Sequence, residues 1–306
     1  MDALSLVAEL EPVAADLLER HLRSSKEWFP HELVPYSRGR DYEPGEAWTP
    51  DDAHLDSPLS SAVRSALFVN LLTEDNLPYY FRDVERMFGR DGAFATWARR
   101  WTAEEGRHAI VIRDYLTVTR ALDPVALERA RMEQVSGGQT PAPPDAFHGL
   151  VYLTLQELAT RIAHRGTGRV LPDRAGYEVM ARVAADENLH HLFYRDLASA
   201  AIERDPSTMV LAIEHQVRTF AMPGTGIPDF DAHAAAIARA GIYDLAVHHE
   251  QILVPVVLRH WRVEELTGLS ADAERARDRL VARIERTGRI GRELQERRAS
   301  NLTPAS

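Results

Sequence analysis

The sequence contains no cysteine, and its 306 residues include a single lysine, Lys26. Without cysteine the chain can form no disulfide, no iron–sulfur cluster and no thiolate metal site, and it has no thiol nucleophile. Any metal ion bound by side chains must therefore be held by histidine, aspartate or glutamate. The search for a metal site reduces to the places where these three residue types gather.

Long hydrophobic runs are also missing. No window approaches 18 uninterrupted apolar residues, and residues 1–21 carry acidic side chains at helical spacing where an export signal would need a basic start and an apolar stretch. We therefore expect no transmembrane segment and a cytoplasmic protein. The 46 acidic residues outnumber the 36 basic ones, and the net charge of -10 argues against nucleic acid as a partner.

Alternating β-branched residues, which would indicate a sheet, are scarce as well. Apolar residues instead recur every three or four positions, which predicts helices. The 45% hydrophobic and 27% charged content is that of an ordinary globular protein. The predicted fold class is all-α, with helices near residues 4–24, 59–88, 92–120, 125–134, 146–165, 173–204, 206–221, 229–241, 244–262 and 271–297.

Proline punctuates this helical pattern. Residues 29–58 hold five prolines and should be irregular, and residues 136–145 (SGGQTPAPPD) separate the chain into two halves. Pro78 and Pro255 fall inside otherwise helical patterns and should kink them.

Four glutamates and two histidines interrupt helix faces that should be buried. They are Glu74, Glu105, His108, Glu157, Glu187 and His190. Each shares its helical face with large apolar side chains three or four residues away. Burying an unpaired carboxylate costs on the order of several kcal/mol, so these six groups must neutralise one another or share a cation.

The six residues follow a repeat. Glu74 precedes Glu105 by 31 residues, Glu157 precedes Glu187 by 30, and a histidine follows three residues after the second glutamate of each pair. Random order would give about one Glu-x-x-His pair, so the arrangement and not the count carries the argument. Glutamate and histidine three residues apart can reach one ion, and four carboxylates balance two divalent cations. A buried polar network without metal is the alternative.

One Glu from each of two helices and Glu-x-x-His from each of two others is the pattern of ferritin-like di-iron bundles. The resemblance then narrows. The segments TEDNLPYY (73–80), RWTAEEGRHAIVIRDYL (100–116), LQELATRIAHR (155–165) and ADENLHHLFYRDL (185–197) resemble those of the soluble acyl-acyl-carrier-protein desaturases, particularly the actinobacterial branch. The likeness extends from the N-terminal helix through HWR (260–262).

This resemblance implies a ferritin-like four-helix bundle core with additional flanking helices. We expect a single domain over residues 1–306, with a metal-binding core at about 59–204 and a C-terminal helix and tail at 271–306. The family's cofactor is a pair of iron ions, for which manganese could substitute. Carried over by residue, one iron would take Glu74, Glu105 and His108, the other would take Glu157, Glu187 and His190, and Glu105 and Glu187 would bridge.

The resemblance also implies roles for residues around the metals. Glu104 and Asp186 would each accept a proton from the metal-bound histidine of the opposite half, unless they are solvated surface acids. Trp28 would join Asp186 in an electron route, or it simply packs a loop. Thr160 would assist proton delivery, or it bonds its own helix.

The implied activity is O2-dependent desaturation of a fatty acyl chain on acyl carrier protein, with electrons from a ferredoxin-type donor and a homodimeric enzyme. Two alternatives stay open: another di-iron oxygenase of carrier-bound chains, such as a hydroxylase or acetylenase, and a non-catalytic helical protein that binds iron or an acyl carrier. The family usually has Asn and Gly where this chain has Gly106 and Ala109. Gly106 should loosen its helix by up to about 1 kcal/mol. His191 is expected to be a packed or surface histidine.

Overall fold

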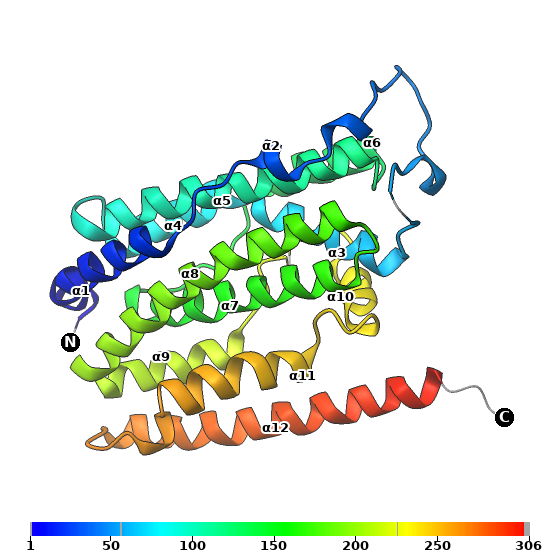
Figure 1. Cartoon of the computed structure of the whole chain (residues 1–306). Coiled ribbons are helices and arrows are strands. Elements are labelled where there is room, and N and C mark those ends of the chain that lie inside the picture. The colour runs from blue at the N-terminus through cyan, green and yellow to red at the C-terminus, as the bar shows by residue number, and fades with distance from the viewer. Residues whose placement is uncertain (1, 56, 225, 303–306) are drawn as a thin grey trace.

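The computed structural model describes residues 2–55, 57–224 and 226–302, and all regular structure in these ranges is helical (Figure 1). The α-helices are α1 (Ala3–Ser24), α2 (Pro30–Leu33), α3 (Ser61–Glu74), α4 (Leu77–Phe88), α5 (Gly92–Thr119), α6 (Pro124–Gly137), α7 (Ala146–Val170), α8 (Arg174–Arg204), α9 (Pro206–Thr219), α10 (Phe230–Arg239), α11 (Leu245–His248) and α12 (Ala271–Leu302). The shorter turns are η1 (Tyr36–Arg38), η2 (Pro50–Asp52) and η4 (Val263–Glu265), and η3 (His249–His260) is a π-helix.

The helices begin where the sequence supplies a cap. α3 starts after Ser60, α7 after Asp145 and α8 after Asp173, and each of these side chains accepts a hydrogen bond from a backbone N–H of the first turn. α3, α5, α7 and α8 form the central bundle, and α7 and α8 pack extensively against each other as a helical hairpin. α9, α11 and α12 lie on the side of the bundle away from α5, as Figure 1 shows. The predicted all-α class is confirmed.

Two apolar cores lie at different heights along the bundle. One contains Trp97 and Trp101 from the first half of α5 and Leu197 from the second half of α8. The other contains Ile112 from the second half of α5 and Val183 from the first half of α8. The stretches of α5 and α8 between the two cores carry Glu105, His108, Glu187 and His190, and α3 and α7 add Glu74 and Glu157. The fold therefore presents these polar groups in a layer that apolar side chains close on both sides.

The helix expected at residues 59–88 is two helices, which corrects the prediction. α3 ends at Glu74, and α4 begins at Leu77 with Pro78 in its first turn. Proline has no N–H to donate and fits the first turn of a helix, so it starts a new helix here instead of kinking a continuous one. The break places Glu74 at the last position of α3.

Two further segments differ from expectation in detail. The predicted helix 244–262 is α11 followed by η3, and Pro255 lies within the π-helical stretch, where the backbone hydrogen-bond pattern has already shifted. The described residues of the proline-rich segment, 29–55 and 57–58, are irregular apart from α2, η1 and η2. The predicted C-terminal helix 271–297 extends to Leu302, and the end of the predicted tail, residues 303–306, lies outside the described residues.

Candidate metal centre

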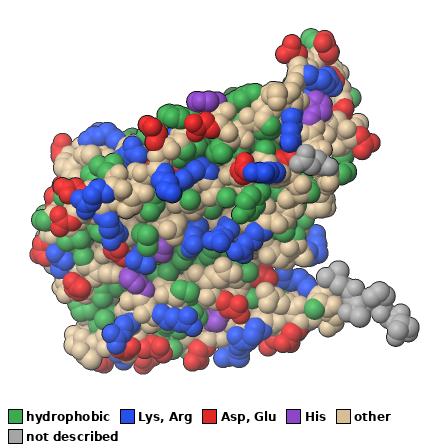
Figure 2. All heavy atoms as spheres, viewed as in Figure 1, with side chains coloured by type: hydrophobic (Ala, Val, Ile, Leu, Met, Phe, Trp, Pro, Cys, Tyr) green, Lys and Arg blue, Asp and Glu red, His purple; other side chains and the backbone are tan. Residues whose placement is uncertain are grey.

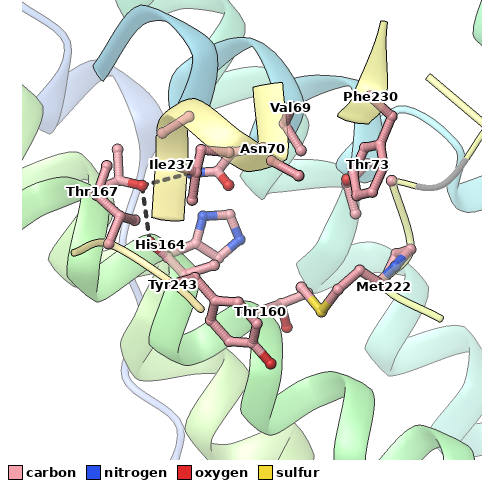
Figure 3. A pocket seen from close by; sticks show the side chains of 16 residues that line it. Val69, Asn70, Thr73, Thr160, His164, Thr167, Met222, Phe230, Ile237 and Tyr243 are labelled. Atoms are coloured by element: carbon pink, nitrogen blue, oxygen red, sulfur yellow. Dashed lines mark hydrogen bonds between the residues drawn. The ribbon is translucent and has the colours of Figure 1, made fainter. Parts of the chain in front are cut away.

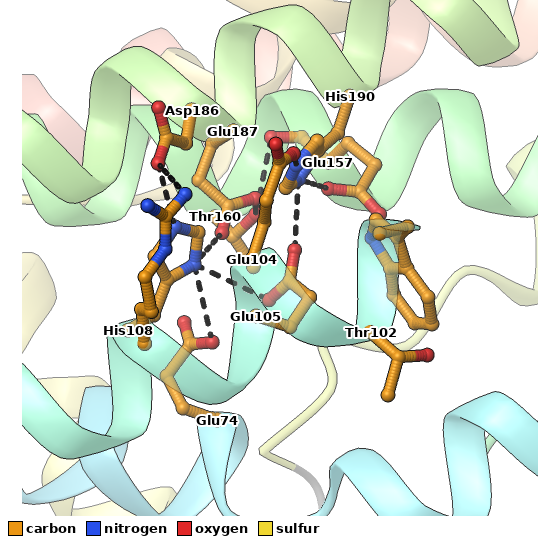
Figure 4. Close-up of polar contacts among 12 residues, drawn as sticks. Glu74, Thr102, Glu104, Glu105, His108, Glu157, Thr160, Asp186, Glu187 and His190 are labelled. Carbon is orange, nitrogen blue, oxygen red and sulfur yellow. Dashed lines mark hydrogen bonds and ion pairs between the residues drawn. The ribbon is translucent and has the colours of Figure 1, made fainter. Parts of the chain in front are cut away.

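The six predicted ligand residues meet in the polar layer of the bundle (Figure 4). α3 contributes Glu74, α5 contributes Glu105 and His108, α7 contributes Glu157, and α8 contributes Glu187 and His190; all six are buried. They form two groups in which one ligand atom of each residue lies within 4.8 Å of the others. The first group is Glu74, Glu105, His108 and Glu187, and the second is Glu105, Glu157, Glu187 and His190. Glu105 and Glu187 belong to both groups, the arrangement that two ions bridged by carboxylates require.

The first group is organised around the inner nitrogen of His108. Its Nδ1 lies 3.2 Å from Glu187 Oε1, 3.3 Å from Glu105 Oε2 and 3.7 Å from Glu74 Oε2. Its Nε2 points the opposite way, 3.5 Å from Asp186 Oδ2. Three carboxylates from three different helices therefore converge on one imidazole nitrogen.

The second group repeats this pattern around His190. Its Nδ1 lies 2.8 Å from Glu105 Oε1 and 3.6 Å from Glu157 Oε2, and its Nε2 donates a hydrogen bond of 2.9 Å to Glu104 Oε2. With the proton on Nε2, the lone pair of Nδ1 faces the carboxylates, as in a metal-ligating histidine held by an outer carboxylate.

The charges of this layer explain why a cation fits it. Burial and the neighbouring Glu187 raise the pKa of Glu157 well above its ordinary value. Burial alone would lower the pKa of His108 and His190, but the surrounding carboxylates raise both pKa values well above the ordinary range. Shared protons thus compensate for unbalanced buried negative charge, a task that divalent cations perform as well.

Hydrogen bonding leaves an inward-facing set of atoms unpartnered. Among the described residues, Glu105 Oε1, Glu157 Oε2, His108 Nδ1 and His190 Nδ1 are buried without a partner in hydrogen-bond geometry. All four face the interior of the two groups. Carboxylate oxygens with imidazole nitrogens are the donor set that suits iron or manganese, so the residues present fit such ions.

The acids behind the histidines are buried and not on the helix surface. Asp186 is 3% exposed and accepts a hydrogen bond of 2.8 Å from Trp28 Nε1. Glu104 is 2% exposed and accepts from His190. Burial would raise the pKa of Glu104, but hydrogen bonds from His190 and His21 hold it well below its ordinary value. The alternative of solvated surface acids is therefore wrong.

Thr160 makes both kinds of contact that the sequence left open. Its hydroxyl lies 2.6 Å from Glu187 Oε2 and also 3.1 Å from the carbonyl oxygen of Glu157 in its own helix. The side chain thus lies beside Glu187, one of the two carboxylates that belong to both groups. Trp28 is 5% exposed and belongs to one of the apolar cores. It therefore packs its loop onto the bundle and also donates a hydrogen bond to Asp186.

Two buried histidines next to the polar layer were missed by the sequence reasoning. His164 Nε2 lies 2.8 Å from Glu74 Oε1, and His21 Nε2 lies 2.9 Å from Glu104 Oε2. Burial would raise the pKa of Glu74, but the neighbouring imidazoles of His108 and His164 hold it at about 2. A signal existed for both histidines, since each lies on the buried stripe of its helix: His164 seven residues after Glu157, and His21 in line with buried apolar residues of α1.

The His191 side chain points away from the polar layer. Its Nδ1 lies 2.9 Å from the carbonyl oxygen of Thr154, and burial lowers its pKa to about 4. It is a packed histidine, one of the two placements expected for it.

An apolar pocket borders the layer on the side of α3 and α7 (Figure 3). Its cavity volume is about 90 Å³, and its walls come mainly from α3, α7, α10 and the segments that precede and follow α10. Thr160 and His164 line the pocket and also contact Glu187 and Glu74 of the polar layer. Met222, Phe230 and Ile237 form part of the opposite wall. The pocket therefore places an apolar cavity next to the two groups.

Comparison with known proteins identifies the family. The model of the fatty acid desaturase family matches residues 2–305. The chain is 41% identical over 288 residues to DesA1 of Mycobacterium tuberculosis, covering 91% of this chain and 84% of DesA1. It is 30% identical over 325 residues to chloroplastic acyl-[acyl-carrier-protein] desaturase 7 of Oryza sativa subsp. indica, covering 97% of this chain and 78% of the rice protein. The X-ray structure of DesA2 from Mycobacterium tuberculosis H37Rv superposes with a TM-score of 0.70 at 26% identity, covering 86% of this chain and 97% of DesA2.

The fold and the buried carboxylate and histidine groups thus define an all-helical protein of the ferritin-like class. The chain belongs to the fatty acid desaturase family, as the resemblance of its motifs predicted. No helix in the described part of the chain combines the length and the apolar character that a membrane span needs.

Proposed function

We propose that this protein is an acyl-[acyl-carrier-protein] desaturase, which introduces a double bond into a fatty acyl chain held as its carrier-protein thioester. The observation that carries the proposal is the apolar pocket whose wall includes Thr160, a residue that also contacts the bridging carboxylate of Glu187. The plant relatives bear the name of this activity. We infer that the chain acts as a single domain and as a homodimer.

The proposed cofactor is a pair of iron ions, with manganese as a substitute. Glu74 and His108 would hold one ion, Glu157 and His190 the other, and Glu105 and Glu187 would bridge them. Two irons bound there would supply the oxidising power that removal of hydrogen from an unactivated methylene requires. In the overall reaction two neighbouring CH2 groups lose two hydrogens, and these, with two electrons from a ferredoxin-type donor and two protons, reduce O2 to two waters.

The chain's own residues prepare the site for this reaction. The pocket wall excludes water and aligns the acyl chain beside Thr160. The Thr160 hydroxyl, 2.6 Å from Glu187 Oε2, is positioned to hold a proton at that carboxylate. Asp186 accepts from Trp28 Nε1 and faces His108 Nε2, so the three residues would form the electron route from the loop to the metals.

The test is a turnover assay with the iron-loaded protein, reduced ferredoxin, O2 and a series of acyl-carrier thioesters, read by product mass. Desaturation predicts a product lighter by two hydrogens, dependent on both O2 and the reductant. A gain of one oxygen would identify a hydroxylase, and a further loss of two hydrogens from an alkene would identify an acetylenase. Carrier or iron binding with an unchanged acyl chain across the series would contradict the enzymatic proposal and favour a binding protein.

A further inference from the structure

Asp186 and Glu104, the acids behind the two ligand histidines, each contact an arginine and a ligand histidine. They differ in the third side chain that contacts them. Asp186 is ion-paired with Arg182 and Glu104 with Arg100, in each case one helical turn earlier. Each acid also faces the Nε2 of the histidine ligand from the opposite half. The N-terminal segment then supplies a different ring to each acid.

Asp186 receives the indole N–H of Trp28, whereas Glu104 receives the imidazole of His21. His21 lies on α1, seven residues before Trp28, so one short piece of chain reaches both halves of the site. Trp28 corresponds to a residue that the resemblance already pointed to. His21 has no such assignment, and the structure gives it an equivalent place on the other half.

The contact between His21 and Glu104 can orient His190, because both rings meet the same carboxylate. Glu104 Oε2 lies 2.9 Å from His21 Nε2 and 2.9 Å from His190 Nε2, with the side chains of His21 and Glu104 only 2% and 3% exposed. The same oxygen therefore receives both rings, which lie 5.9 Å apart between centroids with 30° between their planes. Because Glu104 is fixed from both sides, His190 keeps its proton on Nε2 and its Nδ1 toward Glu105.

His21 also separates this contact from solvent. The residue lines a surface pocket between α1 and α8, whose wall includes Leu17, Ser24 and Leu192. The His21 ring also packs nearly perpendicular to the Trp97 ring, with centroids 4.9 Å apart. Removing the ring would open a path for water toward Glu104, and water would compete with His190 for the carboxylate.

We propose that His21 is a positioning residue for metal binding: through Glu104 it aligns His190, so the docking of α1 sets the affinity of the ion held by Glu157 and His190. This inference rests on the proposed metal centre and adds a residue to it. Because partners behind a metal ligand typically change metal affinity 10–100-fold, the effect is measurable without any turnover.

The experiment is an anaerobic titration of the metal-free protein with Co²⁺, followed by its visible absorbance, for four variants. H21L keeps the ring volume approximately and loses the donor, H21N places a donor one methylene too short, and H21Q places an amide N–H near the position of Nε2. H191Q is the matched control, because His191 is an equally buried histidine that contacts Thr154 and not Glu104. Far-UV circular dichroism of each metal-free variant confirms folding.

We expect the wild type, H21Q and H191Q to bind two equivalents with affinities within about threefold of one another. H21L and H21N should bind the first equivalent normally and the second 10–100-fold more weakly. Wild-type affinity for both equivalents in H21L and H21N would overturn the proposed role of His21 and leave the metal centre standing. The same would follow if H21Q bound the second equivalent as weakly as H21L. A wild type that binds no cobalt would overturn the proposed metal centre and this inference with it.

Discussion

At the scale of single residues, the chain concentrates uncompensated negative charge where it is hardest to bury. Glu157 is fully buried and carries a pKa raised well above its ordinary value by burial and by Glu187. Such a group is costly in the metal-free protein and useful once a cation is present. Replacing the Glu157 carboxylate should therefore weaken metal binding without lowering the stability of the metal-free protein.

Glu157→Gln tests this separation. We expect metal affinity at one position to fall at least tenfold, because an amide is a weaker ligand than a carboxylate, and turnover to be lost. The melting temperature of the metal-free variant should equal or exceed that of the wild type. Glu133→Gln, at an exposed position of α6, is the control that should change neither quantity. Wild-type affinity and activity in the Glu157 variant would refute its assignment as a ligand.

A second residue, His248, links stability to pH. Burial and the neighbouring His249 lower its pKa to about 4, and its Nδ1 lies 2.8 Å from the Tyr243 hydroxyl. The unfolded chain takes up a proton near pH 6.5 and the folded chain only near pH 4. Folding stability should therefore fall as the pH is lowered from 6.5 to 4, and the loss should level off below pH 4.

The variant H248N keeps an acceptor near Nδ1 and cannot titrate. Compared with the wild type, we expect it to lose less stability between pH 7 and pH 4, by on the order of 3 kcal/mol, in denaturant unfolding of the metal-free protein. Identical pH profiles for the two proteins would show that His248 titrates normally in the folded state.

Sequence reasoning did well for residues that break a pattern and less well for residues that fit one. Glu105 and His108 stood out because a charged pair on an apolar stripe needs an explanation. His21 and His164 sit on similar stripes alone, and a single buried histidine is usually just packed. Only the distances to Glu104 and Glu74 reveal what these two histidines contact.

At the scale of elements, the helix boundaries follow caps and prolines more closely than periodicity. The apolar pattern runs through residues 59–88 without a gap, but Asp75 and Asn76 end one helix and Pro78 starts the next. Periodicity cannot detect a break that leaves both helices on the same face. The π-helical register of η3, which covers 12 residues, was also not predicted from the apolar periodicity.

Two glycine-to-alanine changes in helices should have opposite signs. At Gly106 in α5 an added Cβ would meet only Leu77 Cδ2 at 4.0 Å, so G106A should stabilise the protein by about 0.5–1 kcal/mol. At Gly291 in α12 the Cβ would lie 2.8 Å from backbone atoms of Ala246, so G291A should destabilise it by roughly 1–3 kcal/mol. Chemical denaturation measures both. Equal signs for the two variants would contradict the close packing of α12 on α11.

At the scale of the whole molecule, the bundle sets one polar layer between two apolar cores and covers it with flanking helices. Figure 2 shows acidic and basic side chains interspersed over the visible face, with no single-sign region that covers it. The carboxylates and histidines of the two candidate ligand groups are instead buried between α3, α5, α7 and α8.

The proposed homodimer is a property of this scale that the sequence predicts only through family resemblance. Light scattering of the purified protein should give a mass of two chains that does not depend on metal loading, because the ligand groups lie inside one bundle. A monomer with full desaturase activity would show that the dimer is dispensable for catalysis.

The central claim is that six buried side chains from four helices hold two neighbouring iron ions. Anomalous X-ray diffraction from crystals of the iron-loaded protein, collected on both sides of the iron absorption edge, tests it most directly. We expect two iron peaks per chain, one between Glu74 and His108 and one between Glu157 and His190, with Glu105 and Glu187 beside both. Iron peaks elsewhere in the chain, or none within this layer, would contradict it.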